Sequence, residues 1–248
     1  MKFFSRWVLW VALSALGLQL FFLARIATLA VVNPESTTFE RSEAWRLLTQ
    51  KDRLRWSQRW VPYARISDTL KRAVIASEDA DFVNHEGVDW EALEKAWEKN
   101  AQAEAAAAHR SALARAARAA RGAPTPKIVG GSTITQQLAK NLLLSGERTL
   151  LRKGQEFVLT LMLEAFLSKQ RILEIYLNHV EWGEGIFGAE AAAQHYYRKS
   201  AAQLSAWEAA RLAVMLPRPK YFEKLPQSAY LSHRAEIILG RMPAVELP

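Results

Sequence analysis

An acidic cluster with the sequence SEDADFVNHEGVDW lies at residues 77–90. A carboxylate at a partly buried helix end can have a raised pKa and act as a general base. Apolar residues alternate with the acidic ones and should draw the cluster against a core. His85 could orient such a carboxylate or fill an ordinary structural position. The carboxylates are Glu78, Asp79, Asp81, Glu86 and Asp89.

A second polar group is crowded into residues 130–141, which read GGSTITQQLAKN. Ser132 or Thr133 is predicted to cap a helix, and Thr133 with Gln136 fits the capping-box pattern. A helix N-terminus after glycines is also suited to bind anions. The polar side chains therefore either only start a helix or present hydroxyls, amides and a lysine to a phosphorylated ligand. The helix would bury Ile134, Leu138 and Leu142 and expose Thr133, Gln136, Gln137 and Lys140.

A third group lies on a predicted helix in LLRKGQEFVLTLMLEAFLSK, residues 150–169. Glu156, Thr160 and Glu164 share one face of that helix. Burying a glutamate is costly unless it is paired, so a structural ion pair with Arg152 or Lys153 is one interpretation of Glu156. Residues 157–167 are apolar nearly all round but too few to cross a membrane, which predicts a buried core helix.

These groups must be positioned by a chain that begins with an apolar segment. Residues 7–24 are almost uninterrupted in their apolarity, which is long enough for a membrane span. Lys2 and Arg6 precede the segment and predict a cytoplasmic N-terminus with the remainder outside. Arg25 can extend to the far interface. We expect an uncleaved anchor at 1–32; a cleaved signal peptide is the alternative.

Residues 33–65 are rich in Trp and Arg and are predicted to form a juxtamembrane linker, which either lies at the membrane interface or packs on the domain. From residue 66 the patterns are helical: Ser67 or Asp68 can cap a helix that buries Leu70, Val74 and Ile75. Alternating strand patterns are nearly absent, so a mostly α domain is expected at 66–248. Within it, residues 91–126 form an Ala/Arg-rich helical insertion that is either merely solvated or in contact with anionic lipid.

Composition limits the chemistry further. The 248-residue chain carries a formal net charge of +8. That balance favours an anionic partner: nucleic acid, an acidic membrane surface or a phosphorylated substrate. The chain has no cysteine, which excludes disulfides, thiolate nucleophiles and cysteine-ligated zinc.

Taken together, the motifs resemble those of the peptidoglycan glycosyltransferases, which polymerise lipid II. The matching stretches occur in the family's order: EDADFVNHEG, GGSTITQQLAKN, RKGQEFVLTLMLE, KQRILEIYLN and GEGIFGAEAAAQHYYRKSA. The chain resembles the stand-alone, monofunctional biosynthetic type, because no SxxK, SxN or KTG triplet of a transpeptidase occurs. The segment before GGSTITQQ is longer than is usual in the family.

The resemblance implies a mostly α, lysozyme-like single catalytic domain with an N-terminal transmembrane helix. It also implies a reaction in which the 4-hydroxyl of lipid II displaces undecaprenyl diphosphate from the growing glycan chain, with inversion. The implied partners are lipid II, the nascent glycan strand, the membrane and other proteins of wall synthesis and division, and no nucleic acid. The implied location is the inner membrane, crossed once, with the catalytic domain in the periplasm.

Matching the family's motifs to this sequence residue by residue implies a site with one carboxylate base and a set of cations. Glu78 matches the general base and Glu156 the second important carboxylate. The residues matched to substrate contacts are Ser132, Thr133, Gln137, Lys140, Arg152 and Lys153, and the supporting ones are Asp79, Phe82, His85 and Gly87. A departing diphosphate needs positive charge or a divalent metal rather than an acid. Glu156 would therefore order the cations or hold Mg²⁺ or Mn²⁺.

Two other functions are alternatives. A lysozyme-like hydrolase or lytic transglycosylase would need a protonated carboxylic acid at the scissile oxygen and no basic set. A non-catalytic scaffold of the wall-building machinery should lack one of the two matched glutamates, and both are present.

Overall fold

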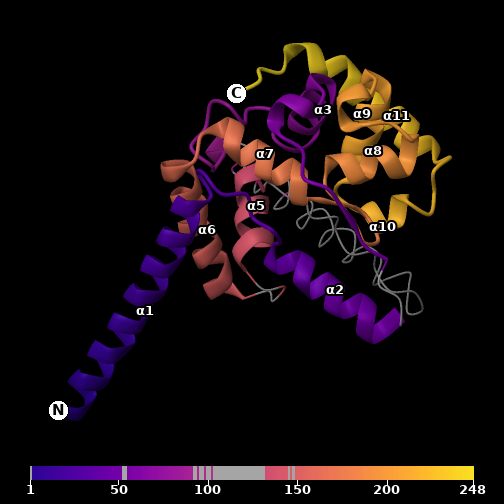
Figure 1. Cartoon of the computed structure of the whole chain (residues 1–248). Helices are drawn as coiled ribbons and strands as arrows, with labels where there is room; N and C mark the ends of the chain where they lie inside the picture. The colour runs from indigo at the N-terminus through magenta and orange to yellow at the C-terminus, as the bar shows by residue number, and fades with distance from the viewer. Residues whose placement is uncertain are drawn as a thin grey trace, which may run out of the picture.

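The computed structural model describes residues 2–51, 55–91, 132–144 and 149–248, with the single positions 94, 98, 102 and 146. Apart from four of its positions, the predicted insertion at 91–126 lies outside the described residues, as do the two glycines before Ser132. The described part of the chain is mostly α-helical, as the sequence predicts (Figure 1).

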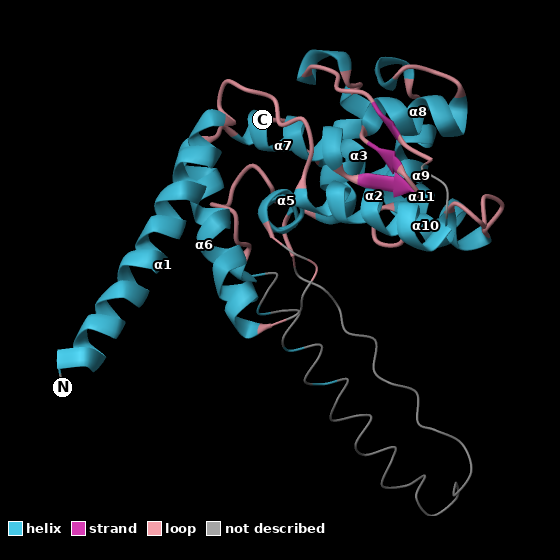
Figure 2. Cartoon of the chain, turned by 60° about the horizontal axis from the view of Figure 1, so that its bottom comes forward, coloured by secondary structure: helices cyan, strands magenta, loops and turns pink. Residues whose placement is uncertain are grey.

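The longer helices are α1 (Lys2–Thr28), α2 (Thr38–Lys51), α3 (Asp68–Glu78), α5 (Ile134–Leu143), α6 (Leu150–Phe166), α7 (Lys169–His179), α8 (Ala189–Tyr197), α9 (Ala206–Met215) and α11 (Ala229–Arg241). Shorter helical turns are η1 (Tyr63–Arg65), η2 (Ala201–Gln203), α10 (Pro219–Phe222) and η3 (Met242–Ala244). The strands β1 (Ser57–Gln58), β2 (Glu181–Gly183) and β3 (Ile186–Phe187) form one small sheet beside α8 (Figure 2). β3 lies in the middle, parallel to β1 and antiparallel to β2.

The helices that carry the candidate site begin where the sequence predicts. Ser67 caps α3 by accepting the backbone N–H of Leu70. Thr133 caps α5 in a complete capping box with Gln136. The predicted core faces are confirmed, because Leu70, Val74 and Ile75 on α3 and Ile134, Leu138 and Leu142 on α5 are all buried. The expectation that Thr133 and Gln136 are exposed is wrong, because both are buried in the capping box at the start of α5.

The expectation that α6 is a buried core helix is wrong in part. Leu159, Leu163 and the following Leu167 are buried, but Val158 and Leu161 are 38% and 44% exposed on the opposite face. Leu151 in the first turn is 87% exposed. One face of α6 packs on α5, and α6 also lies beside α1. The described residues leave the face that carries Val158 and Leu161 partly exposed.

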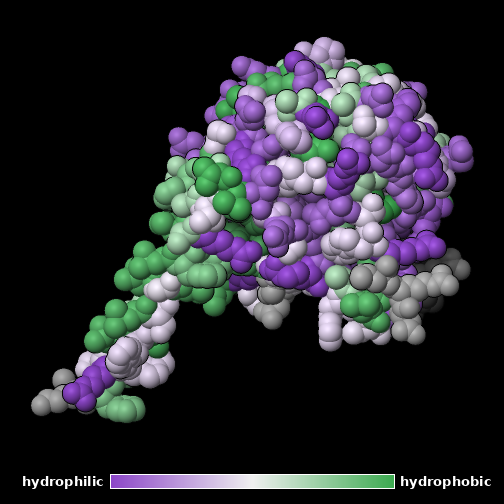
Figure 3. All heavy atoms as spheres, viewed as in Figure 1, coloured by the Kyte–Doolittle hydropathy of each residue, from purple (hydrophilic) through white to green (hydrophobic). Residues whose placement is uncertain are grey.

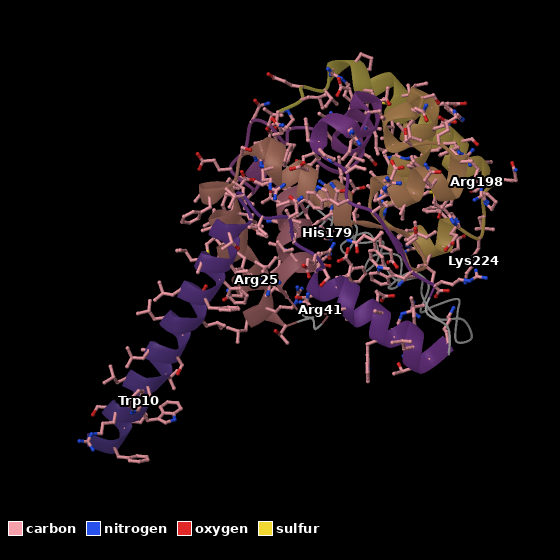
Figure 4. All side chains as sticks on the ribbon, in the orientation of Figure 1. Trp10, Arg25, Arg41, His179, Arg198 and Lys224 are labelled. Carbon is pink, nitrogen blue, oxygen red and sulfur yellow. The ribbon has the colours of Figure 1, made fainter. Side chains whose placement is uncertain are left out.

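The apolar helix α1 extends away from the domain and is long and apolar enough to cross a membrane (Figure 1). Trp10 lies near its free end and Arg25 near the domain (Figure 4). The apolar surface of α1 continues onto the adjoining part of the domain, whereas the rest of that view is largely hydrophilic (Figure 3). These features fit a membrane-anchored protein.

Among the described residues, two sets of side-chain hydrogen bonds link α1 and the turn that follows it to the domain. Gln19 and Gln155 on α6 exchange a pair of amide hydrogen bonds of 2.8 and 3.1 Å. The guanidinium of Arg171 on α7 donates to the carbonyls of Leu29 and Val32, just beyond the end of α1. A cation at these carbonyls suits the negative end of a helix.

The described residues of the 33–65 segment, 33–51 and 55–65, pack on the helical domain. They supply α2, whose Leu47 is buried, and β1 of the sheet. Two of their tryptophan rings contact the domain: Trp56 stacks on Phe187, with ring centroids 4.6 Å apart, and Trp60 lies 5.7 Å from the ring of His179. The division between linker and catalytic domain at residue 66 stays a prediction.

Candidate active site

The site begins at the last residue of α3, where Glu78 meets α5. The Glu78 carboxylate accepts a 2.9 Å hydrogen bond from Nε2 of Gln137. Lys140 follows Gln137 by one turn of α5 and is solvent-exposed, so it brings positive charge near the same carboxylate. α5 therefore presents to Glu78 a hydrogen-bond donor and a cation.

The pKa of Glu78 is raised above its ordinary value because the side chain is partly buried. The neighbouring Asp79 acts in the same direction, whereas the hydrogen bond from Gln137 and the charge of Lys140 lower the pKa. Raising the pKa of a carboxylate makes it a stronger proton acceptor once ionised. The surroundings of Glu78 therefore suit a general base.

Asp79 holds the start of α5 against the loop that follows α3. It is buried, and its two oxygens have different partners: Oδ2 accepts the backbone N–H of Ile134 at 2.9 Å, and Oδ1 lies 2.8 Å from Nε2 of His85. Because Nδ1 of His85 accepts the backbone N–H of Gly87, we assign the ring proton to Nε2, which donates to Asp79. His85 thus contacts the carboxylate next to Glu78, and the supporting roles of Asp79 and His85 stay predictions.

Gly87 allows this loop to pack closely against α6 and α5. Its φ of +79° favours glycine, and a Cβ added there would come within 2.7 Å of Cγ2 of Thr160. Its carbonyl accepts a 2.6 Å hydrogen bond from the hydroxyl of Thr133. Thr133 is buried and occupied as a helix cap, so its observed contacts are internal to the protein.

Residues that the sequence analysis left without a role support the same loop. Lys169 on α7 donates to the carbonyl of His85 at 2.5 Å and to Glu164 at 2.8 Å, and its ammonium lies 4.6 Å from the centroid of the buried Phe82 ring. Thr135 also donates to Glu164, at 2.6 Å. Lys169 lies within the motif KQRILEIYLN, but no local spacing predicts a contact with a loop over eighty residues earlier.

The basic residues on α6 gather around Glu156. This carboxylate is buried; one oxygen pairs with Arg152 at 3.2 Å and the other with the ammonium of Lys153. Glu156 lies one turn before Thr160 on the face that packs against the Gly87 loop. The predicted ion pairing of Glu156 is confirmed, and it holds Arg152 and Lys153 next to the face of α6 that packs against the Gly87 loop.

A metal site at Glu156 does not fit these contacts. Both of its oxygens are engaged by cations, and among the described residues no group of three or more His, Asp or Glu side chains could hold a metal ion. A divalent cation prefers several oxygen ligands. These residues therefore do not form a protein-held metal site.

Three polar residues at the start of α5 differ in their surroundings. Ser132 is exposed, Thr133 is buried as the cap, and Gln137 is partly buried between Glu78 and the hydroxyl of Tyr176. Tyr176 on α7 is a neighbour of the site that local sequence patterns did not indicate. The expected substrate contacts of Ser132, Thr133 and Gln137 stay predictions.

Comparison with known proteins identifies the family. Residues 46–243 match the family described as Transglycosylase. A biosynthetic peptidoglycan transglycosylase of Burkholderia thailandensis is 54% identical over 234 residues, covering 94% of this chain and 83% of that protein. One of Herminiimonas arsenicoxydans is 50% identical over the whole of both chains. The mostly α, lysozyme-like fold is thereby confirmed, and the chain belongs to the transglycosylase family.

Proposed function

We propose that the protein is a peptidoglycan glycan-chain polymerase that uses lipid II. Its similarity to proteins named biosynthetic peptidoglycan transglycosylases supports the substrate class. The observation that carries the mechanism is the setting of Glu78: a carboxylate with a raised pKa is held by Gln137 one turn from Lys140. That arrangement places a proton acceptor next to a cation.

In the proposed reaction the 4-hydroxyl of lipid II attacks the anomeric carbon of the growing chain. Glu78 takes the hydroxyl proton as the new glycosidic bond forms. The bond from the anomeric carbon to the diphosphate oxygen breaks, and undecaprenyl diphosphate leaves with the bonding electrons. One direct displacement inverts the anomeric centre.

Cations are suited to stabilise this leaving group because a diphosphate departs as an anion and needs no proton. We assign this role to Lys140, Arg152 and Lys153. Glu156 keeps the latter two together on α6, through the ion pairs described above. A hydrolase would instead need a carboxylic acid at the scissile oxygen, and no described contact favours that alternative over the polymerase.

The exposed face of α6 supports a site at the membrane surface. Leu151, Val158, Leu161 and Phe166 are exposed on the helix that lies beside α1. Apolar side chains there could contact the same lipid layer that holds the polyprenyl tail of the substrate. With Lys2 and Arg6 before the span, we place the N-terminus in the cytoplasm and the catalytic domain in the periplasm, on the inner membrane.

The base assignment is tested with the purified full chain in detergent and lipid II as substrate. Glu78→Gln should lower the rate of glycan polymerisation by roughly 100- to 10,000-fold, because the attacking hydroxyl loses its proton acceptor. Glu86→Gln, an exposed change in the following loop, should retain the parental rate. Polymerisation that persists in Glu78→Gln would refute the assigned base. Cleavage of finished glycan without any polymerisation would refute the proposed reaction.

A further inference from the structure

Three side chains form a hydrogen-bonded chain from α7 through α5 to the end of α3. The hydroxyl of Tyr176 donates to Oε1 of Gln137 at 3.0 Å, and Nε2 of Gln137 donates to Oε2 of Glu78 at 2.9 Å. Tyr176 is 1% exposed. Its hydroxyl is therefore a fixed internal partner rather than a group that solvent could replace.

The two ends of the Gln137 amide are chemically different. Only the NH₂ end can donate to an ionised carboxylate, whereas the oxygen end would repel it. A donor at the oxygen end holds the amide in the productive orientation. Burial raises the pKa of Tyr176 well above its ordinary value, and the nearby Glu78 and Asp79 act in the same direction, so the phenol keeps its proton and stays a donor.

We propose that Tyr176 is a positioning residue for the reaction, acting through Gln137: its hydroxyl holds the amide in the orientation that donates to the Glu78 carboxylate. This inference rests on the proposed role of Glu78 as the base. It assigns Gln137 mainly to the carboxylate, in place of the direct substrate contact that the family resemblance implies. Tyr176 itself touches neither substrate nor the reacting atoms.

The pH dependence of the enzyme should report this arrangement. Among the described residues, the charged and titratable groups that act on Glu78 are Asp79 directly after α3, Lys140 on α5 and Tyr176 on α7. The amide hydrogen bond stabilises the ionised form of Glu78 and so opposes the rise in pKa caused by burial. If the amide turns away, the pKa of Glu78 rises further, and a higher pH is needed to ionise the base.

The test compares rate profiles over pH for the full chain in detergent, with lipid II as substrate. Tyr176→Phe keeps the buried ring and removes only the hydroxyl. We expect the midpoint of the acid limb of kcat to move up by about half to one pH unit. KM for lipid II should change little, because binding contacts are untouched. Tyr196→Phe, which removes a hydroxyl that donates to the carbonyl of Trp182, should leave the acid limb in place.

The middle residue supplies the second arm. Gln137→Leu should shift the acid limb at least as far as Tyr176→Phe, and adding Tyr176→Phe to Gln137→Leu should shift it no further. An unshifted limb in Tyr176→Phe, or two additive shifts, would overturn the proposal. Should Tyr176→Phe fail to fold, an unshifted limb in Gln137→Leu overturns it alone.

Failure of this proposal is distinguishable from failure of the proposed function. If Glu78→Gln retains activity, Glu78 is not the base, and the proposed role of Tyr176 in positioning Gln137 for Glu78 fails with it. Loss of activity in Glu78→Gln together with an unshifted Tyr176→Phe limb leaves Glu78 as the base and removes only the role of Tyr176.

Discussion

Glu156 is a buried carboxylate that forms ion pairs with two cations, Arg152 and Lys153. Arg152 is itself largely withdrawn from solvent, and its Nε has no hydrogen-bond partner. Buried charges such as those of Glu156 and Arg152 are stable only as a pair, and Lys153, whose side chain is 53% exposed, adds a second cation from the surface. The three residues should therefore behave as one unit in catalysis.

This unit can be tested by combining substitutions. Lys153→Met in the parent should lower kcat/KM for lipid II by roughly 10- to 100-fold, because a cation that stabilises the leaving diphosphate is lost. In a Glu156→Gln background the same change should cost much less, since Lys153 is no longer held in place. Steady-state polymerisation rates of the four proteins measure the coupling. Multiplicative losses would show that Glu156 acts independently of Lys153.

Contacts between residues that are close in the sequence were predictable. The capping box of Thr133 and Gln136 and the ion pairs of Glu156 involve neighbours three or four residues away, where helix geometry sets the contact. Tyr176 was not predictable, because its partner Gln137 lies on another helix. The apolar periodicity of α5 or of α7 does not predict a contact between Tyr176 and Gln137.

At the scale of elements, one lysine joins three of them. Lys220 on α10 pairs with Glu43 on α2 at 2.5 Å and with Glu181 on β2 at 3.1 Å. Because the single ammonium is shared, it only partly offsets the burial of Glu181, and burial raises the pKa of that carboxyl from 4.5 to about 7. We therefore expect the junction of α2, β2 and α10 to be sensitive to pH.

The sign of this sensitivity follows from the raised pKa. The folded protein binds the Glu181 proton more tightly than the unfolded chain does. The contribution of protonated Glu181 to the free energy of unfolding is therefore fully present below about pH 4.5 and is lost as pH rises to about 7. Glutamine cannot ionise, so Glu181→Gln should abolish the loss of stability that ionisation of Glu181 causes. It should raise the free energy of unfolding at pH 8 by on the order of 2 kcal/mol relative to the parent. Denaturant unfolding at pH 5 and pH 8 measures it.

The control for this comparison is Glu246→Gln, which changes an exposed carboxylate and should follow the parent at both pH values. A pH-independent difference between Glu181→Gln and the parent would contradict the assignment.

The sequence predicted the helices α3, α5 and α6 because their apolar spacing and caps are local. It was wrong about the outer face of α6. An apolar residue in contact with lipid and one in contact with protein are alike in a sequence, and only the placement of α6 beside α1 separates Val158 and Leu161 from Leu159 and Leu163.

At the scale of the whole molecule, a pair of amides joins the anchor to the domain. Gln19 lies two to three turns before the end of α1, roughly 13 Å along the helix axis. An unpaired amide at that depth in a bilayer is costly, and Gln155 on α6 satisfies it. The first turns of α6 should then lie at the level of the lipid rather than above it.

A double-mutant cycle tests this pairing. Gln19→Leu and Gln155→Leu should each destabilise the protein by about 0.5–2 kcal/mol, because each leaves the opposite amide without a partner. The double variant should be less destabilised than the sum, since no amide remains. Thermal unfolding in detergent gives the coupling, and Leu20→Ala, beside Gln19 but exposed, serves as the control. Strict additivity would exclude a specific amide pair.

The contacts of Gln19 and of Arg171 hold α1 at two different heights, one within the helix and one just beyond its end. With one contact, α1 could change its angle to the domain, whereas two contacts at different heights fix that angle. The tilt of α1 in the bilayer should therefore set the angle at which the Glu78 site meets the membrane plane. A bilayer of different thickness would change that angle without altering a single residue of the site.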